Sequence, residues 1–116
     1  MAETNQNLVI YQNANEAITI AITDDNGNPM DLKLYSDLCW VLTLSGKEIL
    51  RYDINDSELV IANADAVDDG LRVLLSPAIT GALKERVYVH QAWGTYGDNT
   101  RPLCIGYATV LRGDGC

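Results

Sequence analysis

Apolar side chains recur at every second position in short runs of this chain, and that period is the spacing of a β-strand with one buried face. Residues 16–23 place Ile18, Ile20 and Ile22 on one face and Ala or Thr on the other. We therefore expect the three isoleucines to face a core. Residues 38–44 repeat the alternation with leucine and tryptophan, so more than one strand contributes to this core.

Turn-forming residues separate the alternating runs and set their order. The segment 24–29 concentrates Asp, Asn, Gly and Pro, which predicts a tight loop that closes an early hairpin. Residues 77–83 form a short, alanine-containing segment, which predicts one or two helical turns that cap the open end of a sandwich. A first strand is expected at 8–11, and three more strand pairs at 38–44 with 48–54, 59–62 with 71–75, and 86–96 with 103–112.

Length and charge limit the classes of protein that fit. A chain of 116 residues forms one domain, 1–116, with its own core. The apolar run 8–11 is too short for a signal peptide, and no run reaches the roughly 20 residues of a membrane span, so we expect neither export nor membrane insertion. The net charge of −8 disfavours a nucleic-acid partner. The charge is −10 over 1–70 and +2 over 71–116, which fits either a solvated acidic surface or complementary edges that orient copies or partners.

The three cysteines, Cys39, Cys104 and Cys116, are an odd number without CxxC spacing, which predicts neither a zinc site nor a closed disulfide framework. A reducing compartment fits this pattern best. Cys39 and Cys104 fall inside predicted strands, where they are either inert buried thiols or a pair that bridges the sandwich. Cys116 is expected to be a free thiol at the end of the chain.

No group of residues has the composition of a catalytic, cofactor or metal site. His90 is the only histidine and lacks a nucleophile motif, so we interpret it as structural or surface. Asp24, Asn26 and Asn28 alternate as some calcium ligands do, but no glutamate follows at the twelfth position, which favours a turn. Two carboxylate pairs in predicted turns are expected to serve backbone geometry rather than acid–base chemistry: Asp53 with Asp56, and Asp68 with Asp69.

The last predicted hairpin is unusual because its strand at 86–96 is apolar or aromatic on both faces. Either this strand is central and covered on both faces within the fold, or its outer face docks a partner chain with Trp93 as an aromatic anchor. A third interpretation is a stacking platform for sugar rings. The candidate partner-binding residues are Val87, Val89, Trp93 and Tyr96, and the candidate sugar platform is Trp93, Tyr96 and Tyr107.

The order of several segments is shared with a known domain. These segments are residues 8–12, 16–23, 25–32 and 69–83, with Tyr88 and a final strand at 104–112 that follows a Gly-Asp turn. In this order the chain resembles the N-terminal β-sandwich of phage baseplate upper proteins and related tail or fibre-attachment proteins. The resemblance implies a single Ig-like antiparallel β-sandwich of about seven or eight strands with one short helical turn.

The resemblance also implies a function. It implies a non-enzymatic virion component that assembles in the host cytoplasm and joins protein rings or fibres in the tail, baseplate or neck. The expected partners are other virion proteins, the chain is expected to be a homo-oligomer within the assembly, and no cofactor is expected. Two alternatives stay open: a carbohydrate-binding β-sandwich module for a host-surface glycan, and a capsid decoration protein.

Overall fold

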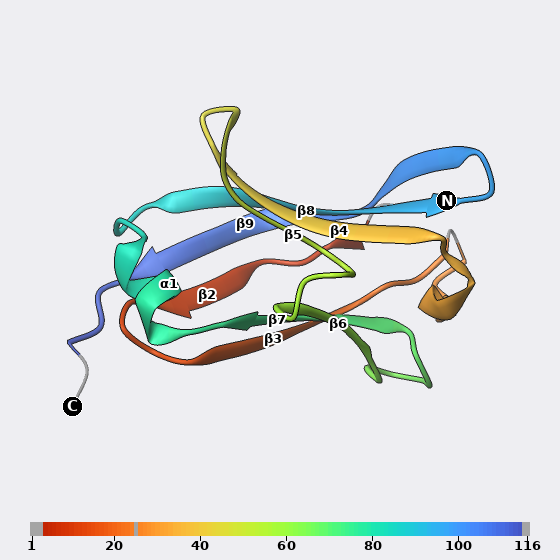
Figure 1. Ribbon diagram of the computed structural model, residues 1–116, viewed down its shortest axis with the longest axis horizontal. Helices are drawn as coiled ribbons and strands as arrows, with labels where there is room; N and C mark the ends of the chain where they lie inside the picture. The colour runs from red at the N-terminus through yellow and green to blue at the C-terminus, as the bar shows by residue number, and fades with distance from the viewer. Residues whose placement is uncertain (1–3, 25, 115–116) are drawn as a thin grey trace.

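The computed structural model describes residues 4–24 and 26–114, and these form two β-sheets packed face to face (Figure 1). The larger sheet has the order β1 and β2, β9, β8, β4, β5, and the smaller sheet has the order β3, β7, β6. This order confirms the predicted all-β sandwich, although the described part of the chain has nine strands, including the two-residue β1, rather than the expected seven or eight. The strands are β1 (Thr4–Asn5), β2 (Leu8–Tyr11), β3 (Glu16–Ala21), β4 (Asp37–Leu44), β5 (Lys47–Asp53), β6 (Leu59–Ala62), β7 (Gly70–Leu75), β8 (Val87–Tyr96) and β9 (Asn99–Leu111).

The two N-terminal strands pair in parallel with β9, which corrects the expectation of a fully antiparallel sandwich. In β2, Leu8 lies opposite Ala108 and Tyr11 lies opposite Leu111. The other strand pairs of the two sheets are antiparallel, as predicted. Side chains alternate with period two in both directions, so the apolar pattern of residues 8–11 does not report which way the strand runs.

Residues 24 and 26–29 belong to the predicted tight loop, and Thr23 and Pro29 on either side of it form an antiparallel bridge. Asp24 Oδ1 accepts hydrogen bonds from the backbone N–H groups of Asn26 and Asn28, both at 2.9 Å. The chain then passes through a 3₁₀ turn, η1 (Leu32–Leu34), into β4, which lies in the other sheet. The expected early hairpin is therefore present only as this short antiparallel bridge, since the chain then crosses to the other sheet, and the Asp24 carboxylate serves its own turn.

The core lies between the sheets and contains the side chains that the alternation predicts. Ile20 and Ile22 are fully buried, and Ile18 is partly buried against the same cluster. Strand β4 contributes from the opposite sheet, which confirms that its apolar face points inward. Its fully or almost fully buried side chains are Leu38, Trp40 and Leu42.

A short helix, α1 (Pro77–Ala82), follows β7 and closes one end of the sandwich, as predicted (Figure 1). Ser76 is its N-cap, and the Ser76 Oγ accepts a hydrogen bond from the Ile79 N–H at 3.3 Å. The buried Thr80 hydroxyl donates to the Ala14 carbonyl at 2.8 Å. This bond ties α1 to the loop between β2 and β3.

The segment between β1 and β2 is held by a buried histidine. His90 Nδ1 accepts a hydrogen bond from Trp40 Nε1 at 3.3 Å, and His90 Nε2 donates to the Gln6 carbonyl. A β-carbon at Gly106 would overlap that same carbonyl oxygen, so the close approach requires glycine there. Burial lowers the pKa of His90, although its bond to Gln6 opposes this, and the imidazole is neutral. His90 is a structural residue, one of the two expected roles.

The loop between β6 and β7 folds around the carboxylate of Asp69. Asp69 is fully buried and accepts hydrogen bonds from the N–H groups of Ala64 at 2.7 Å and of Asp65 and Ala66 at 3.0 Å each. Burial alone would raise the pKa of Asp69, but these backbone bonds outweigh it and the pKa lies below its usual value. The carboxylate therefore serves backbone geometry, as predicted for this turn.

Cys39 and Cys104 are free thiols, so the bridging alternative is wrong. Cys104 points into the core and is fully buried, and burial raises its pKa to about 11. Cys39 is partly buried on β4, and the pKa of its thiol is also raised by burial. Cys116 lies outside the described residues.

Candidate functional site

One face of the larger sheet points away from the smaller sheet, and we call its part over β2, β9 and β8 the outer face. Burial alternates along these strands, so the outward positions follow from the register. Large apolar side chains on this face are half exposed: Val9 is 52% exposed, Tyr11 49%, Val87 56% and Tyr107 59%. The other outward side chains are Val89, Gln91, Trp93 and Thr95 on β8 and Thr100, Pro102, Ile105, Thr109 and Leu111 on β9.

None of these outward positions carries an acidic or basic side chain, although 21% of the chain is charged. Charged residues return farther across the sheet: Asp37 on β4 lies opposite Thr95, and on β5 Arg51 lies opposite Val41 and Asp53 lies opposite Cys39. A contiguous apolar patch of this kind on a small protein marks an interaction site more often than a solvated surface. The outer face is therefore the strongest candidate for an interface.

The structure brings three of the four predicted partner-binding residues onto this face. Val87, Val89 and Trp93 project outward from β8. Trp93 is partly buried and its Nε1 donates to Gln91 Oε1 at 2.8 Å, so the polar edge of the indole is already satisfied. Tyr96 lies on the other side of β8, with its ring edge-to-face against Tyr35. The structure therefore separates Tyr96 from both the predicted interface and the predicted sugar platform.

A hollow of about 350 Å³ lies in the outer face. Its apolar walls are Val89, Ile105 and Tyr107, and its floor is Gly106. Asn7 closes one side, where its Oδ1 accepts a hydrogen bond from the Tyr107 N–H at 3.1 Å. Binding energy at interfaces concentrates where an anchor side chain fills a pocket, so this hollow can receive an apolar side chain of a partner.

Sequence reasoning did not assign Val9, Tyr11 and Leu111 to this site. Val9 and Tyr11 reach the outer face only because β2 pairs in parallel with β9, about 100 residues away in the chain. Leu111 lies opposite Tyr11 at the same edge. A signal was present in residues 105–111, where Ile105, Tyr107 and Leu111 recur with the spacing of one face of a strand.

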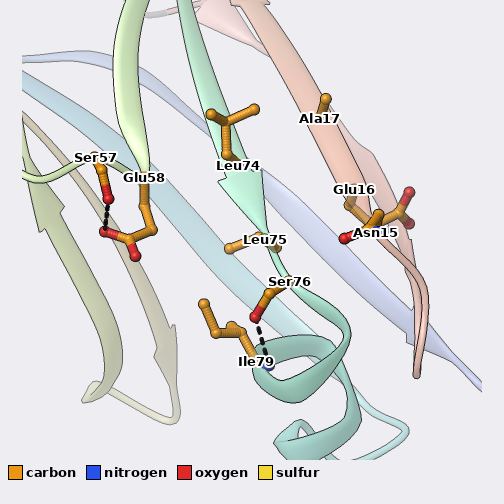
Figure 2. Close-up of a pocket in the computed structure, with 9 residues that line it drawn as sticks. All are labelled: Asn15, Glu16, Ala17, Ser57, Glu58, Leu74, Leu75, Ser76 and Ile79. Carbon is orange, nitrogen blue, oxygen red and sulfur yellow. Dashed lines mark hydrogen bonds between the residues drawn. The ribbon is translucent and has the colours of Figure 1, made fainter.

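A second depression, of about 520 Å³, lies at the end of the smaller sheet nearest α1 (Figure 2). Figure 2 shows Glu16 and Glu58 on opposite sides of the side chain of Leu74. The Glu16 carboxylate accepts a hydrogen bond from the Tyr11 N–H at 2.8 Å, and the Ser57 hydroxyl donates to Glu58 at 3.4 Å. These polar groups are bound to one another or to the backbone, and His90, the only histidine of the chain, lies in the core.

Residues 4–24 and 26–114 contain no group of three or more His, Cys, Asp or Glu placed to hold a metal ion. Within the same residues, no helix has the length and apolar character needed to cross a bilayer. In comparisons with known proteins, no family model and no curated protein matches this chain.

Proposed function

We propose that this chain is a non-enzymatic structural protein that docks other proteins through the outer face of its larger sheet. The observation that carries the proposal is the uncharged, half-exposed apolar surface over β2, β9 and β8. An enzyme needs titratable or nucleophilic groups within reach of a substrate, whereas this surface offers packing area and one apolar hollow.

The resemblance of the sequence to phage baseplate domains supports a location in a virion. On this proposal the chain is an adaptor in the tail, baseplate or neck of a tailed bacteriophage, and it assembles in the host cytoplasm. Its partners are other virion proteins and further copies of itself within the assembly, and it contacts neither nucleic acid nor membrane. The net charge of −8 keeps the free subunit soluble until its apolar face is covered.

The test compares two exposed valines that differ in position. Val87 is 56% exposed on the outer face, and Val67 is 71% exposed in the loop between β6 and β7. Val87→Glu places a charge inside the proposed interface, and Val67→Glu adds the same charge elsewhere. Tyr107→Glu, at the rim of the hollow, is a second interface variant.

The mass of each purified variant is measured by light scattering, alone and after co-expression with the structural proteins encoded beside it. We expect the wild type and Val67→Glu to form a complex, and Val87→Glu and Tyr107→Glu to weaken it at least tenfold, because a buried unpaired charge is costly. Unchanged melting temperatures show that the variants are folded. A wild type that stays monomeric, or a complex that tolerates both interface variants, contradicts the proposal.

A further inference from the structure

A pocket of about 380 Å³ is lined by residues beside the turn between β8 and β9. This turn lies at the end of the sandwich opposite α1 (Figure 1). Its walls come from three segments: the loop after β3, the 3₁₀ turn η1, and the ends of β8 and β9 that meet at their hairpin. Pockets that bind small molecules start at about 300 Å³, so this pocket suits a single ring rather than a long chain. It is separate from the outer face.

Two tyrosine rings form the apolar part of this pocket. Tyr35 and Tyr96 lie edge-to-face, with ring centroids 5.7 Å apart and planes at 66°. A β-carbon at Gly94 would lie 2.8 Å from the Tyr35 ring, so glycine at this position lets the ring lie directly against β8. Tyr96 nevertheless remains 54% exposed, and Leu34, also in the lining, is 63% exposed. The pocket therefore presents fixed aromatic surface to solvent.

Polar groups of both charges surround the two rings. Asp24 and Asp31 each use Oδ1 to accept backbone hydrogen bonds, from Asn28 at 2.9 Å and from Lys33 at 3.0 Å, which fixes the position of each carboxylate. Their second oxygens have no hydrogen-bond partner among the described residues. Arg101 likewise has no carboxylate within 4.0 Å in the described part of the chain. Asn99 adds an amide donor and acceptor.

We propose that this pocket binds a sugar ring. The C–H face of a pyranose packs on aromatic side chains, and its hydroxyl groups both donate to carboxylates and accept from guanidinium and amide groups. The pocket supplies these partners through Tyr96, Asp24, Asp31, Asn99 and Arg101. A simple anion is repelled by the two carboxylates. A metal ion lacks ligands here, because the described residues contain no group of three or more His, Cys, Asp or Glu placed to hold one. The proposal does not depend on protein docking, because the two surfaces share no residue.

The test titrates glucose, galactose, N-acetylglucosamine and N-acetylneuraminic acid into the isotope-labelled full chain and follows backbone amide shifts. We expect at least one sugar to bind with a dissociation constant on the order of 1 mM, with shifts confined to residues 24–35 and 94–101. Arg101→Ala and Tyr96→Ala should each weaken binding about tenfold or more, which corresponds to the loss of one charged hydrogen bond or one aromatic contact. Both residues are exposed, so both variants are expected to fold.

Arg86→Ala is the matched control, since Arg86 is exposed, is also an arginine, and precedes β8 at the α1 end. It should bind the same sugar as tightly as the wild type does. A second titration compares the free monosaccharide with an oligosaccharide that has the same sugar at its end. Tighter binding of the oligosaccharide identifies a glycan polymer, rather than a free sugar, as the source of the bound ring. No shift with any of the four sugars overturns the proposal. Shifts centred on Trp93 or Tyr107 overturn it as well, because they place the sugar on the outer face.

Discussion

At the scale of single residues, two buried polar side chains hold segments of the chain that apolar packing does not reach. The Asp69 carboxylate organises the loop before β7, and the His90 imidazole joins the Gln6 backbone to Trp40 in the core. Neither residue can be recognised from the sequence, because Asp69 is one of several acidic turn residues and His90 is a lone histidine in a strand. Burial and hydrogen-bond partners, which depend on distant segments, distinguish them.

The first prediction concerns the loop around Asp69. Asp69→Ala leaves three backbone N–H groups without their acceptor, so we expect the free energy of unfolding to fall by about 2–3 kcal/mol. Asp65→Ala is the matched control, because the Asp65 side chain is exposed in the same loop and should change stability by less than about 0.5 kcal/mol. Urea denaturation measures both variants, and equal losses in the two would contradict the assigned role.

The second prediction is a dependence of stability on pH that comes from His90. The pKa of His90 is lowered by burial in the folded protein, whereas in the unfolded chain it is about 6.5. The unfolded state therefore binds a proton more readily, so stability is full above about pH 6.5 and falls as the pH drops toward the lowered folded pKa. Protonation also places an N–H at Nδ1, which faces the donor Nε1 of Trp40.

Urea midpoints at about pH 7.5 and pH 5.5 measure this effect. His90→Gln should be less stable than the wild type at the higher pH but should lose much less stability between the two values. Since the chain has one histidine, no other side chain of this type contributes to the change. A decrease of the same size in His90→Gln would assign the pH dependence to other groups.

At the scale of elements, sequence patterns predict the strands and hairpins whose formation depends on residues close together in the chain. Alternation predicts β3, β4 and their inward faces, and turn residues predict the β4–β5, β6–β7 and β8–β9 pairs. What the patterns miss depends on contacts between distant segments: the parallel direction of β2, and the passage of the chain to the other sheet after residue 29. The same reason explains why only part of the candidate interface was predicted. Its residues on β8 follow from the local pattern, whereas its residues on β2 depend on the pairing of β2 with β9.

The third prediction concerns α1, the only α-helix among the described residues. Ser76→Ala removes the acceptor of the Ile79 N–H and should lower the free energy of unfolding by about 1 kcal/mol. Ser76→Asp restores a side-chain acceptor at the N-cap, so it should recover most of that loss. Chemical denaturation of the three proteins tests the assignment, and an alanine variant as stable as the wild type would show that the cap contributes little.

At the scale of the whole molecule, the outer face and the two ends of the sandwich are distinct surfaces. The outer face is apolar and uncharged, the end near α1 is closed by the helix, and the opposite end carries the tyrosine pocket. A protein partner on the outer face and a sugar in the pocket could therefore be bound at the same time.

The fourth prediction follows from combining an apolar docking face with a net charge of −8. Two free copies repel each other through their charge, and salt screens that repulsion without weakening apolar contacts. We expect the apparent mass in sedimentation to rise between about 0.05 M and 0.5 M NaCl, where the Debye length falls to a few ångströms. Tyr107→Glu should stay monomeric at both concentrations, and association that weakens with salt would point to ion pairs instead.

The pairing of β2 with β9 also constrains how the chain is made. Leu8 lies opposite Ala108, so β2 has no partner until residues about 100 positions later in the sequence have been synthesised. Strand β8 likewise has one free edge until β9 emerges. The larger sheet therefore closes after translation of its last strand, and a ribosome that stalls within residues 99–111 holds a nascent chain whose edges are open to other chains.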